Sequence, residues 1–268
     1  ADLHVIAIDR DPEALARARS RLAPFEGRVS FVHAVYDEIA DAVRDAGHDS
    51  VQGVLFDLGV SSMQLDVAER GFAYAQDAPL DMRMNPEDEL TAADVLNTYP
   101  VRDLAKVLRE YGEEKFAQRI AVAVAARRVE EPFTTNGRLV ELIGDSIPAP
   151  ARRTGGNPAK RTFQALRIEV NDELGAYRRA LPDSLDVLAP GGRVVVLAYH
   201  SLEDRITKRA FAAVTTTDVP RGVPVVPEHH RARFRLVTRG AEQATEIEIE
   251  QNRRAKSVRL RCVERIAS

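Results

Sequence analysis

LHVIAIDRDPEALARAR, residues 3–19, is a short apolar strand that ends at Asp9 and leads directly into an amphipathic helix. Asp11 precedes Pro12, the pattern of an N-cap residue followed by proline at the first helical position, so we interpret Asp11 as a helix cap. Asp9 stands at the carboxyl end of the strand, where open α/β sheets bind ligands. Its carboxylate can accept both hydroxyls of a ribose. A solvated loop acid is the alternative interpretation of Asp9.

The first part of the chain alternates short apolar runs with helical patterns. Strands are predicted at residues 3–8, 29–33 and 51–57, with helices near 12–23 and 37–46. This alternation is typical of βαβ units, in which a helix connects two parallel strands. We therefore predict an α/β protein with a mostly parallel sheet.

Composition limits the classes of protein that this chain can belong to. It has 268 residues, 44% of them hydrophobic, which suits a packed globular core. No apolar run approaches the roughly 18 to 20 residues of a membrane span, and we expect a cytoplasmic protein. A lone cysteine, Cys262, excludes an intramolecular disulfide and argues against a Cys-based zinc site. His229 and His230 are adjacent, which is poor ligand spacing, and are interpreted as loop residues.

Basic residues are clustered although the formal charge is −3. Two stretches contain no acid: RRTGGNPAKRTFQALR at residues 152–167 and NRRAKSVRLR at residues 252–261. Phosphate binding depends on such clusters more than on net charge. Nucleic acid therefore stays among the candidate ligands.

The middle of the chain changes to helical patterns without strands from about residue 73 to residue 160. We predict a helical insertion there, with an exposed loop at residues 147–161 that is rich in Pro, Gly and Arg. A long helix is predicted from Ala159. Its apolar positions are Phe163, Leu166, Ile168, Val170 and Leu174.

The α/β pattern resumes in the last third of the chain. LAPGG reads as a glycine turn before a buried strand at residues 193–199 and a helix. Two further strands, beginning near residues 234 and 258, could pair antiparallel. TEIEIE, residues 245–250, fits either a strand or a short acidic helix.

A second strand ends in polar residues in VLFDLGVSSMQLD, residues 54–66. Asp57 ends the strand, and Ser61 and Ser62 follow. These side chains would lie in the crevice at the carboxyl end of the sheet. A tight turn with helix-capping serines is the alternative interpretation.

Nine blocks, in order along the chain, are similar to the motifs of the RsmH (MraW) family. They are AIDRDP, DLGVSSMQLD, ERGFAY, PLDMRM, YGEEKFAQRIA, RTFQALRIEVN, LAPGGR, HSLEDRI and RRAKSVRLR. The resemblance implies a class I, Rossmann-like methyltransferase fold with an antiparallel C-terminal strand. It implies a discontinuous methyltransferase domain over residues 1–72 and 161–268, and a helical domain over 73–160 for substrate recognition. The implied reaction is S-adenosylmethionine-dependent N4-methylation of a cytidine in the decoding centre of 16S ribosomal RNA.

The resemblance also implies which residues contact the cofactor. Asp9 would take the ribose hydroxyls, and Tyr36, where the family usually has phenylalanine, would lie against the adenine. Asp57 and Gln64 complete the implied set. The family's glycine-rich cofactor loop has no counterpart here, so we expect the sequence to begin after the family's first strand. That strand would lie between the strands at 3–8 and 51–57, and a central ladder would be missing.

Methyl transfer is an in-line displacement that needs alignment and no metal. Amino methyltransferases often place an Asp/Asn-Pro-Pro-aromatic turn against the target nitrogen, and this chain has DLGVSS instead. The candidate acceptors for the cytosine amino group are Ser61, Ser62 and His200, although a structural His200 is an equal alternative.

An unstacked cytidine needs basic residues to hold the flanking phosphates. The candidates are Arg161, Arg167, Arg205, Arg253, Arg254 and Lys256, against the general rule that most surface arginines are only solvated. A methyltransferase for a small molecule or protein, and a non-catalytic RNA-binding protein with a degenerate cofactor site, are the rival interpretations. The sequence leaves open whether the protein forms a homodimer.

Overall fold

The computed structural model describes residues 3–152, 157–217 and 232–266. The predictions for His229 and His230 and the basic residue Arg153 fall outside this part of the chain. The chain divides into two compact units. We call residues 1–59 and 174–268 the sheet unit and residues 60–173 the helical unit.

The helical unit extends beyond the predicted insertion at both ends. Its core includes Phe72, which precedes residue 73, and Phe163 and Val170, which follow residue 160. These side chains pack against the helical core, so their segments belong to that unit.

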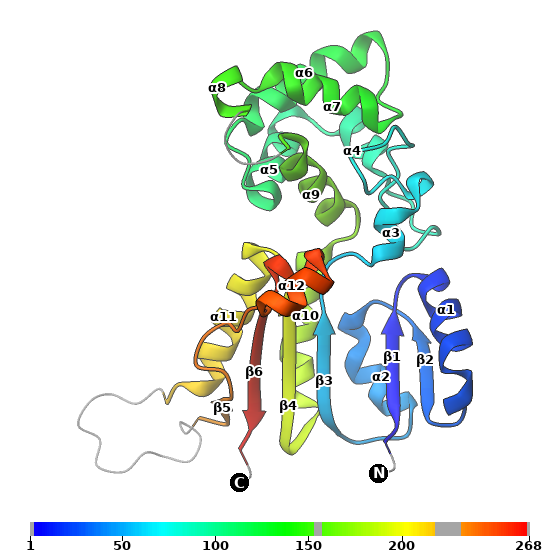
Figure 1. Cartoon of the computed structure of the whole chain (residues 1–268), viewed down its shortest axis with the longest axis vertical. Helices are drawn as coiled ribbons and strands as arrows, with labels where there is room; N and C mark the ends of the chain where they lie inside the picture. Colours follow the sequence, from blue (N-terminus) through cyan, green and yellow to red (C-terminus); the bar gives the residue numbers. More distant parts are fainter. Residues whose placement is uncertain (1–2, 153–156, 218–231, 267–268) are drawn as a thin grey trace, which may run out of the picture. The chain divides into compact units, whose positions relative to one another are not determined.

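The strands of the sheet unit form two sheets (Figure 1). Their bounds are β1 (Val5–Asp9), β2 (Val29–His33), β3 (Val51–Asp57), β4 (Leu188–Ala198), β5 (Phe234–Leu236) and β6 (Arg259–Arg265). β1 pairs parallel with β2. The other sheet has the order β3-β4-β6-β5, in which β3 and β4 are parallel and β6 is antiparallel to β4 and β5. The predicted mostly parallel sheet and its antiparallel C-terminal strands are confirmed.

A break separates β1 from β3. Within the described residues no ladder joins these strands. Val5 in β1 is 40% exposed and Leu55 in β3 is 65% exposed. Apolar side chains are therefore open to solvent in the two strands that border the break.

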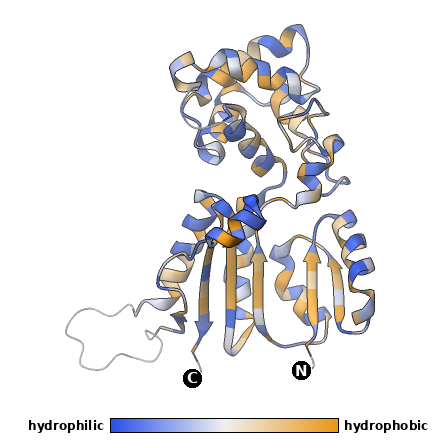
Figure 2. Cartoon of the chain, viewed as in Figure 1, coloured by the Kyte–Doolittle hydropathy of each residue, from blue (hydrophilic) through white to orange (hydrophobic). Residues whose placement is uncertain are grey.

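The core of the sheet unit surrounds the four-stranded sheet. Val194, Val196 and Val263 are fully buried, and Tyr177 and Phe211 pack with them from the flanking helices α10 (Glu173–Asp186) and α11 (Ser201–Thr215). Figure 2 shows apolar colouring along much of β3 and β4. On the other sheet, α1 (Pro12–Leu22) and α2 (Ile39–Asp45) contribute the buried residues.

The predicted glycine turn before β4 is instead part of the strand. Val51 pairs with Leu188 and Gly53 with Arg193, so β4 carries extra residues that β3 does not match. A Cβ at Gly192 would lie 2.8 Å from the Ala189 carbonyl oxygen. The glycine permits this irregularity because the backbone approaches too closely for a side chain.

The helical unit packs its helices around one apolar core. The helices are α3 (Ser62–Asp66), α4 (Ala92–Thr98), α5 (Val101–Gly112), α6 (Ala117–Glu130), α7 (Asn136–Ser146), α8 (Ala149–Arg152) and α9 (Ala159–Val170). Apolar residues of α5, including Leu104 and Leu108, are buried beside Ala165 and Leu166 of α9.

The prediction of one long helix through Leu174 is wrong. α9 ends at Val170, and Asp172 has a left-handed backbone with φ of 45°. The Asn171 amide donates to the carbonyls of Met82 and Arg167, and its oxygen accepts from the Met84 N–H at 2.7 Å. This side chain therefore binds backbone groups at the point where the helix stops.

TEIEIE forms a helix, α12 (Glu246–Gln251). Thr245 accepts from the Glu248 N–H, and the Glu248 carboxylate accepts from the Thr245 N–H at 2.7 Å. This capping box selects the helix over the strand. A 3₁₀ turn, η5 (Arg253–Ser257), follows and leads into β6.

Candidate functional site

Asp9 ends β1, as the sequence predicts. Its Oδ1 accepts the Asp11 N–H at 2.8 Å, and the Asp11 carboxylate in turn accepts the Glu13 N–H at 3.0 Å. Asp11 is fully buried and caps α1, which confirms its structural interpretation. Partial burial of the Asp9 carboxyl group raises its pKa, although the backbone N–H of Asp11 acts in the opposite direction. The Asp9 residue itself is exposed at the end of the strand.

Tyr36 follows β2 in a 3₁₀ turn, η2 (Tyr36–Glu38). Its ring is half-buried and lies edge-on to Phe56, with 5.8 Å between the ring centroids. Phe56 is in β3 and belongs to the core of the four-stranded sheet. Tyr36 thus packs its ring against the buried Phe56 of a strand that ends one residue later, at Asp57.

Asp57 is exposed at the end of β3 and has one clear partner, Tyr199, just beyond the end of β4. The Tyr199 hydroxyl donates to Asp57 Oδ1 at 2.8 Å. Partial burial, together with this hydrogen bond, raises the pKa of Tyr199, so the hydroxyl keeps its proton. Gly59 has φ of 89°, and a Cβ there would contact the Tyr199 ring. Sequence reasoning missed Tyr199, although its place beside His200 was a usable signal.

His200 precedes α11 and is nearly buried, with 11% of its side chain exposed. Its Nε2 lies 3.1 Å from Glu203 Oε1. The other Glu203 oxygen accepts the backbone N–H groups of Tyr199 and His200, at 2.7 and 3.2 Å. These contacts fix the first turn of α11 through the backbone N–H of His200, and the role of its ring stays a prediction.

Ser61, Ser62 and Gln64 lie in the helical unit. Ser61 Oγ accepts the Gln64 N–H at 3.2 Å, and Gln64 Oε1 accepts the Ser61 N–H at 3.0 Å. This capping box starts α3 and supports the helix-cap interpretation of Ser61. Ser62 is exposed.

The predicted RNA-binding residues are distributed over both units. In the helical unit, Arg161 is exposed on α9, whereas Arg167 makes a two-point ion pair with Glu173, with Nε–Oε1 at 2.7 Å and Nη2–Oε2 at 3.0 Å. Only 15% of the Arg167 side chain is exposed, so it is a poor phosphate ligand. In the sheet unit, Arg205 is exposed on α11, and η5 contains Arg253, Arg254 and Lys256.

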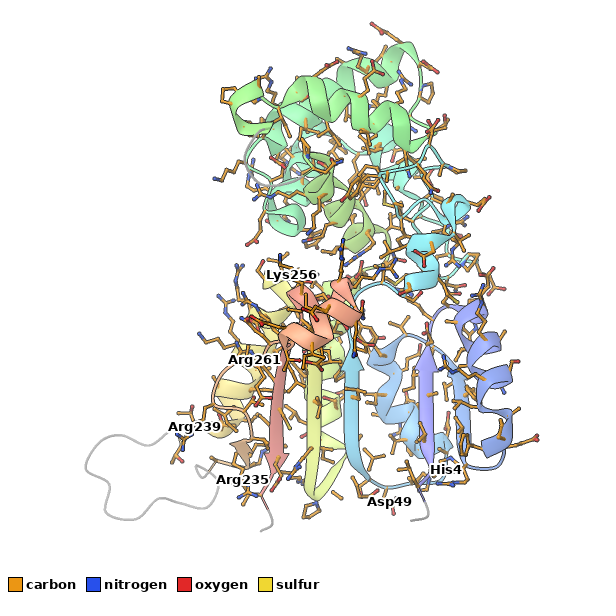
Figure 3. All side chains as sticks on the ribbon, in the orientation of Figure 1. His4, Asp49, Arg235, Arg239, Lys256 and Arg261 are labelled. Carbon is orange, nitrogen blue, oxygen red and sulfur yellow. The ribbon has the colours of Figure 1, made fainter. Side chains whose placement is uncertain are left out.

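A small cavity lies next to the end of β4. Its volume is about 210 Å³, and it is lined by Tyr199, His200, Ser201, Gln243, Lys256, Ser257, Val258 and Arg259. Lys256 and His200 therefore line the same cavity. It also contains Arg259 and Gln243, which sequence reasoning did not single out. Figure 3 shows Lys256 at the end of the sheet where β3 and β4 finish, and Arg235 at the opposite end.

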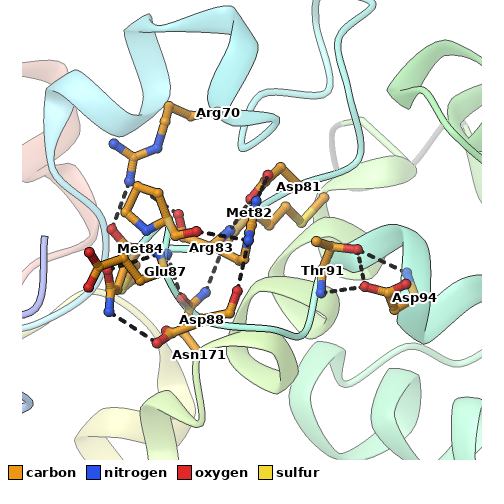
Figure 4. A network of polar contacts seen from close by, with 12 residues as sticks. Arg70, Asp81, Met82, Arg83, Met84, Glu87, Asp88, Thr91, Asp94 and Asn171 are labelled. Atoms are coloured by element: carbon orange, nitrogen blue, oxygen red, sulfur yellow. Dashed lines mark hydrogen bonds and ion pairs between the residues drawn. The ribbon is translucent and has the colours of Figure 1, made fainter.

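The helical unit contains a tightly bonded loop around Arg83 (Figure 4). The Arg83 guanidinium donates to both Asp81 oxygens, at 2.9 and 2.7 Å, and to the carbonyls of Pro86 and Asp88. Arg70 donates to the carbonyls of Arg83 and Met84. This loop coincides with PLDMRM, one of the sequence blocks that carried the resemblance.

Comparison with protein families gives a match to the MraW methylase family over residues 1–266. The chain belongs to this family. Curated relatives with high identity are each named ribosomal RNA small subunit methyltransferase H. The protein from a Nocardioides species is 65% identical over 97% of this chain and 82% of its own length. Those from Streptomyces avermitilis and Mycolicibacterium gilvum are 59% and 61% identical, covering 99% and 98% of this chain and 83% and 71% of their own lengths.

Neither a membrane-spanning helix nor a metal-binding cluster occurs in the described residues. None of the described helices has the length and apolar character that a membrane crossing needs. The same residues contain no group of three or more His, Cys, Asp or Glu side chains arranged to hold a metal ion.

Proposed function

We propose that this protein transfers a methyl group from S-adenosylmethionine to N4 of a cytidine in 16S ribosomal RNA. Membership of the MraW methylase family over nearly the whole chain carries this proposal. The names of the relatives support ribosomal RNA of the small subunit as the substrate. The carboxylates of Asp9 and Asp57, exposed at the ends of β1 and β3, supply a suitable site.

The residues at these strand ends fit S-adenosylmethionine. Asp9 would accept the ribose hydroxyls, Tyr36 would offer its ring to the adenine, and Asp57 would bind in the same crevice. Gln64 stays in the proposed set through the resemblance alone, since its side chain is buried and its Oε1 accepts the Ser61 N–H. The bound cofactor supplies an electrophilic methyl group on a sulfonium.

The chain's own residues have to orient the cytosine amino group, whose lone pair is delocalised into the ring. Acceptors that hold the amino hydrogens favour the attacking geometry. Of the proposed acceptors, Ser61 Oγ already accepts a helix-cap hydrogen bond, and the His200 ring is nearly buried beside Glu203. Ser62 is exposed and is the acceptor that we favour.

We assign recognition of the RNA substrate to the helical unit and to the basic residues of η5. The target cytidine has to be unstacked to reach the end of the sheet, which suits a splayed RNA segment. The proposed phosphate ligands are Arg161, Arg205, Arg253, Arg254 and Lys256. Arg167 is the weakest of the predicted ligands, because its guanidinium is paired with Glu173. Action on ribosomal RNA supports the proposed cytoplasmic location. Sedimentation of the full chain tests whether it forms a homodimer.

A methylation assay tests the proposed function. Stripped 16S RNA and assembled small subunits are incubated with tritiated S-adenosylmethionine, and the RNA is digested and separated into nucleosides. We expect label in N4-methylcytidine with the original protein and none with Asp57→Ala. Label in a protein or small molecule would support a methyltransferase for such a substrate. Tight RNA binding without cofactor binding would support a non-catalytic RNA-binding protein.

A further inference from the structure

The cavity beside β4 has a wall that the fold builds from three separate segments. Glu242 and Leu260 exchange two backbone hydrogen bonds of 2.9 Å, which places the neighbouring Gln243 beside the start of β6. The turn η5 is capped by Asn252, which accepts the Arg254 N–H at 3.1 Å. This turn places Lys256 and Ser257 on the cavity. The first turn of α11 closes the third side with His200 and Ser201.

The lining of the cavity is cationic and contains no acid. Lys256 and Arg259 supply the charge, and Gln243 and Ser257 supply neutral hydrogen-bond donors. The acidic helix α12 precedes η5 but contributes no lining residue. Such a donor set matches an anion, and specifically a phosphodiester with its unesterified oxygens.

Arg259 forms an ion pair with Asp204, which is buried in the first turn of α11. Arg259 Nη1 lies 3.0 Å from Asp204 Oδ2, and Arg261 Nε lies 2.7 Å from Oδ1. One carboxylate thus faces two guanidinium groups, so this ion-pair cluster carries one positive charge in excess, while a second carboxylate, Glu203, lies against His200 of the lining. The Arg259 side chain remains 47% exposed.

The cavity is linked to the methyltransferase site by one side chain. Tyr199 lines the cavity, and its hydroxyl donates to Asp57 Oδ1 at 2.8 Å. A ligand in the cavity therefore lies one side chain away from the carboxylate at the end of β3. A nucleotide chain whose target base lies beside the cofactor proposed at Asp57 would have a backbone phosphate within reach of Lys256.

We propose that this cavity binds one backbone phosphate of the RNA strand, next to the target cytidine, through Lys256 and Arg259. The proposal rests on the proposed function and names a subsite of it. The proposal gives Lys256 a different role from its neighbours Arg253 and Arg254, which do not line the cavity. These two arginines contact RNA through the general attraction between opposite charges, without a fixed phosphate.

The first test compares RNA binding by Lys256→Ala and Lys208→Ala. Both variants remove one lysine, but Lys208 is exposed on α11 and does not line the cavity. The probe is a single-stranded oligonucleotide with the decoding-centre sequence, titrated at several salt concentrations. We expect Lys256→Ala to raise Kd about tenfold and to lower the salt slope by about 0.7, as for one lost phosphate contact. Equal Kd and slope in the two variants would overturn the proposal.

The second test locates the phosphate. Each phosphate near the cytidine is replaced in turn by an uncharged methylphosphonate, and Kd is measured for the original protein and for Lys256→Ala. We expect one position to weaken binding in the original protein and to have no further effect in the variant, because the two partners share one interaction. Additive losses at every position would overturn the proposal.

These outcomes are separate from the failure of the proposed function. A protein that methylates no RNA but shows one Lys256-dependent phosphate would refute the function and retain the subsite. A protein that methylates RNA, but whose Lys256→Ala variant binds and reacts like the original, would retain the function and refute the subsite.

Discussion

The two sheets of the sheet unit differ in how their strands are covered. In the four-stranded sheet, Val194, Val196 and Val263 are fully buried, and helices with Tyr177 and Phe211 complete the core. In the two-stranded sheet, every strand residue is half-buried or exposed. Tyr199 and the proposed phosphate cavity therefore lie next to the well-buried strand β4, whereas Asp9 ends a strand with no fully buried residue. The residues proposed to bind the cofactor are thus carried by two sheets that differ in burial.

A matched pair of phenylalanines tests this contrast most strongly. Phe211→Ala removes a ring that is 1% exposed against the four-stranded sheet, and we expect a loss of about 3–5 kcal/mol of unfolding free energy. Phe31→Ala acts on a half-buried ring of β2 that lies 4.7 Å from the Arg19 guanidinium, and we expect about 1–2 kcal/mol. Urea denaturation gives both values. Equal losses would remove the contrast.

Amide hydrogen exchange gives the next largest effect. The ladder between β4 and β6 runs from Arg193–Glu264 to Ala198–Arg259 and lies inside the four-stranded sheet. We expect its amides to exchange at least about a hundredfold more slowly than those of β1 and β2, because sheets with few buried contacts open more often. Mass spectrometry of exchanged fragments measures this ratio. Similar protection in both sheets would contradict it.

The Asp57 site gives an intermediate effect. Asp57→Ala removes a carboxylate at the proposed cofactor crevice, and we expect at least about tenfold weaker S-adenosylmethionine binding with RNA binding changed less than twofold. Calorimetry and filter binding measure the two affinities. The control is Tyr199→Phe, which keeps the carboxylate but removes the hydroxyl that donates to it. It should weaken cofactor binding less than Asp57→Ala does. Equal loss of both ligands in Asp57→Ala would place Asp57 outside the crevice.

The smallest expected effect is the change in folding stability with pH. Its sign differs between Asp204, which pairs with β6 of the four-stranded sheet, and Asp9, which ends β1 of the two-stranded sheet. Burial acts to raise the pKa of Asp204, but Arg261 and Arg259 outweigh it and hold this pKa below its usual range. The ion pair therefore stabilises the protein above about pH 4, the unfolded pKa, and the contribution is lost as the pH falls through the lowered value. The stability difference between the original protein and Asp204→Asn should shrink over that range.

The contribution of Asp9 to folding stability should change with pH in the opposite direction. Burial raises its pKa, so its ionised form destabilises the fold once the pH exceeds that raised value. Asp9→Asn should therefore stabilise the protein slightly at pH 7, with the gain disappearing as the pH falls toward about 4. Thermal denaturation between these two pH values measures it. A loss of stability at pH 7 would show that the Asp9 carboxylate is stabilised in the fold.

Local patterns predicted much of the fold. The strands Val29–His33 and Val51–Asp57 follow from short apolar runs, and the caps at Asp11 and Ser61 follow from residue type and spacing. The break after Val170 did not follow, because it depends on Asn171 binding backbone groups at Met82 and Met84, distant in sequence.

The candidate site was predictable where it lies at strand ends, and less so where charges meet across the fold. Asp9 and Asp57 were found from strand pattern alone. Arg167 was predicted as a phosphate ligand because it lies in a stretch without acids. Its ion pair with Glu173 did not follow from the sequence, because the pair requires the helix break between the two residues. The Asp204 pair with Arg259 joins residues 55 positions apart and needs the antiparallel pairing of β6.

The Arg83 loop has a consequence for which sequences this protein can tolerate. The guanidinium makes four hydrogen bonds in three directions, to Asp81, Pro86 and Asp88. A lysine would keep the charge, but its single nitrogen carries only three protons and cannot span the same acceptors. Beside it, Met82 is fully buried with φ of 61° and depends on its surroundings to keep that conformation. In a library that randomises position 83, selection for folded protein should recover arginine almost alone.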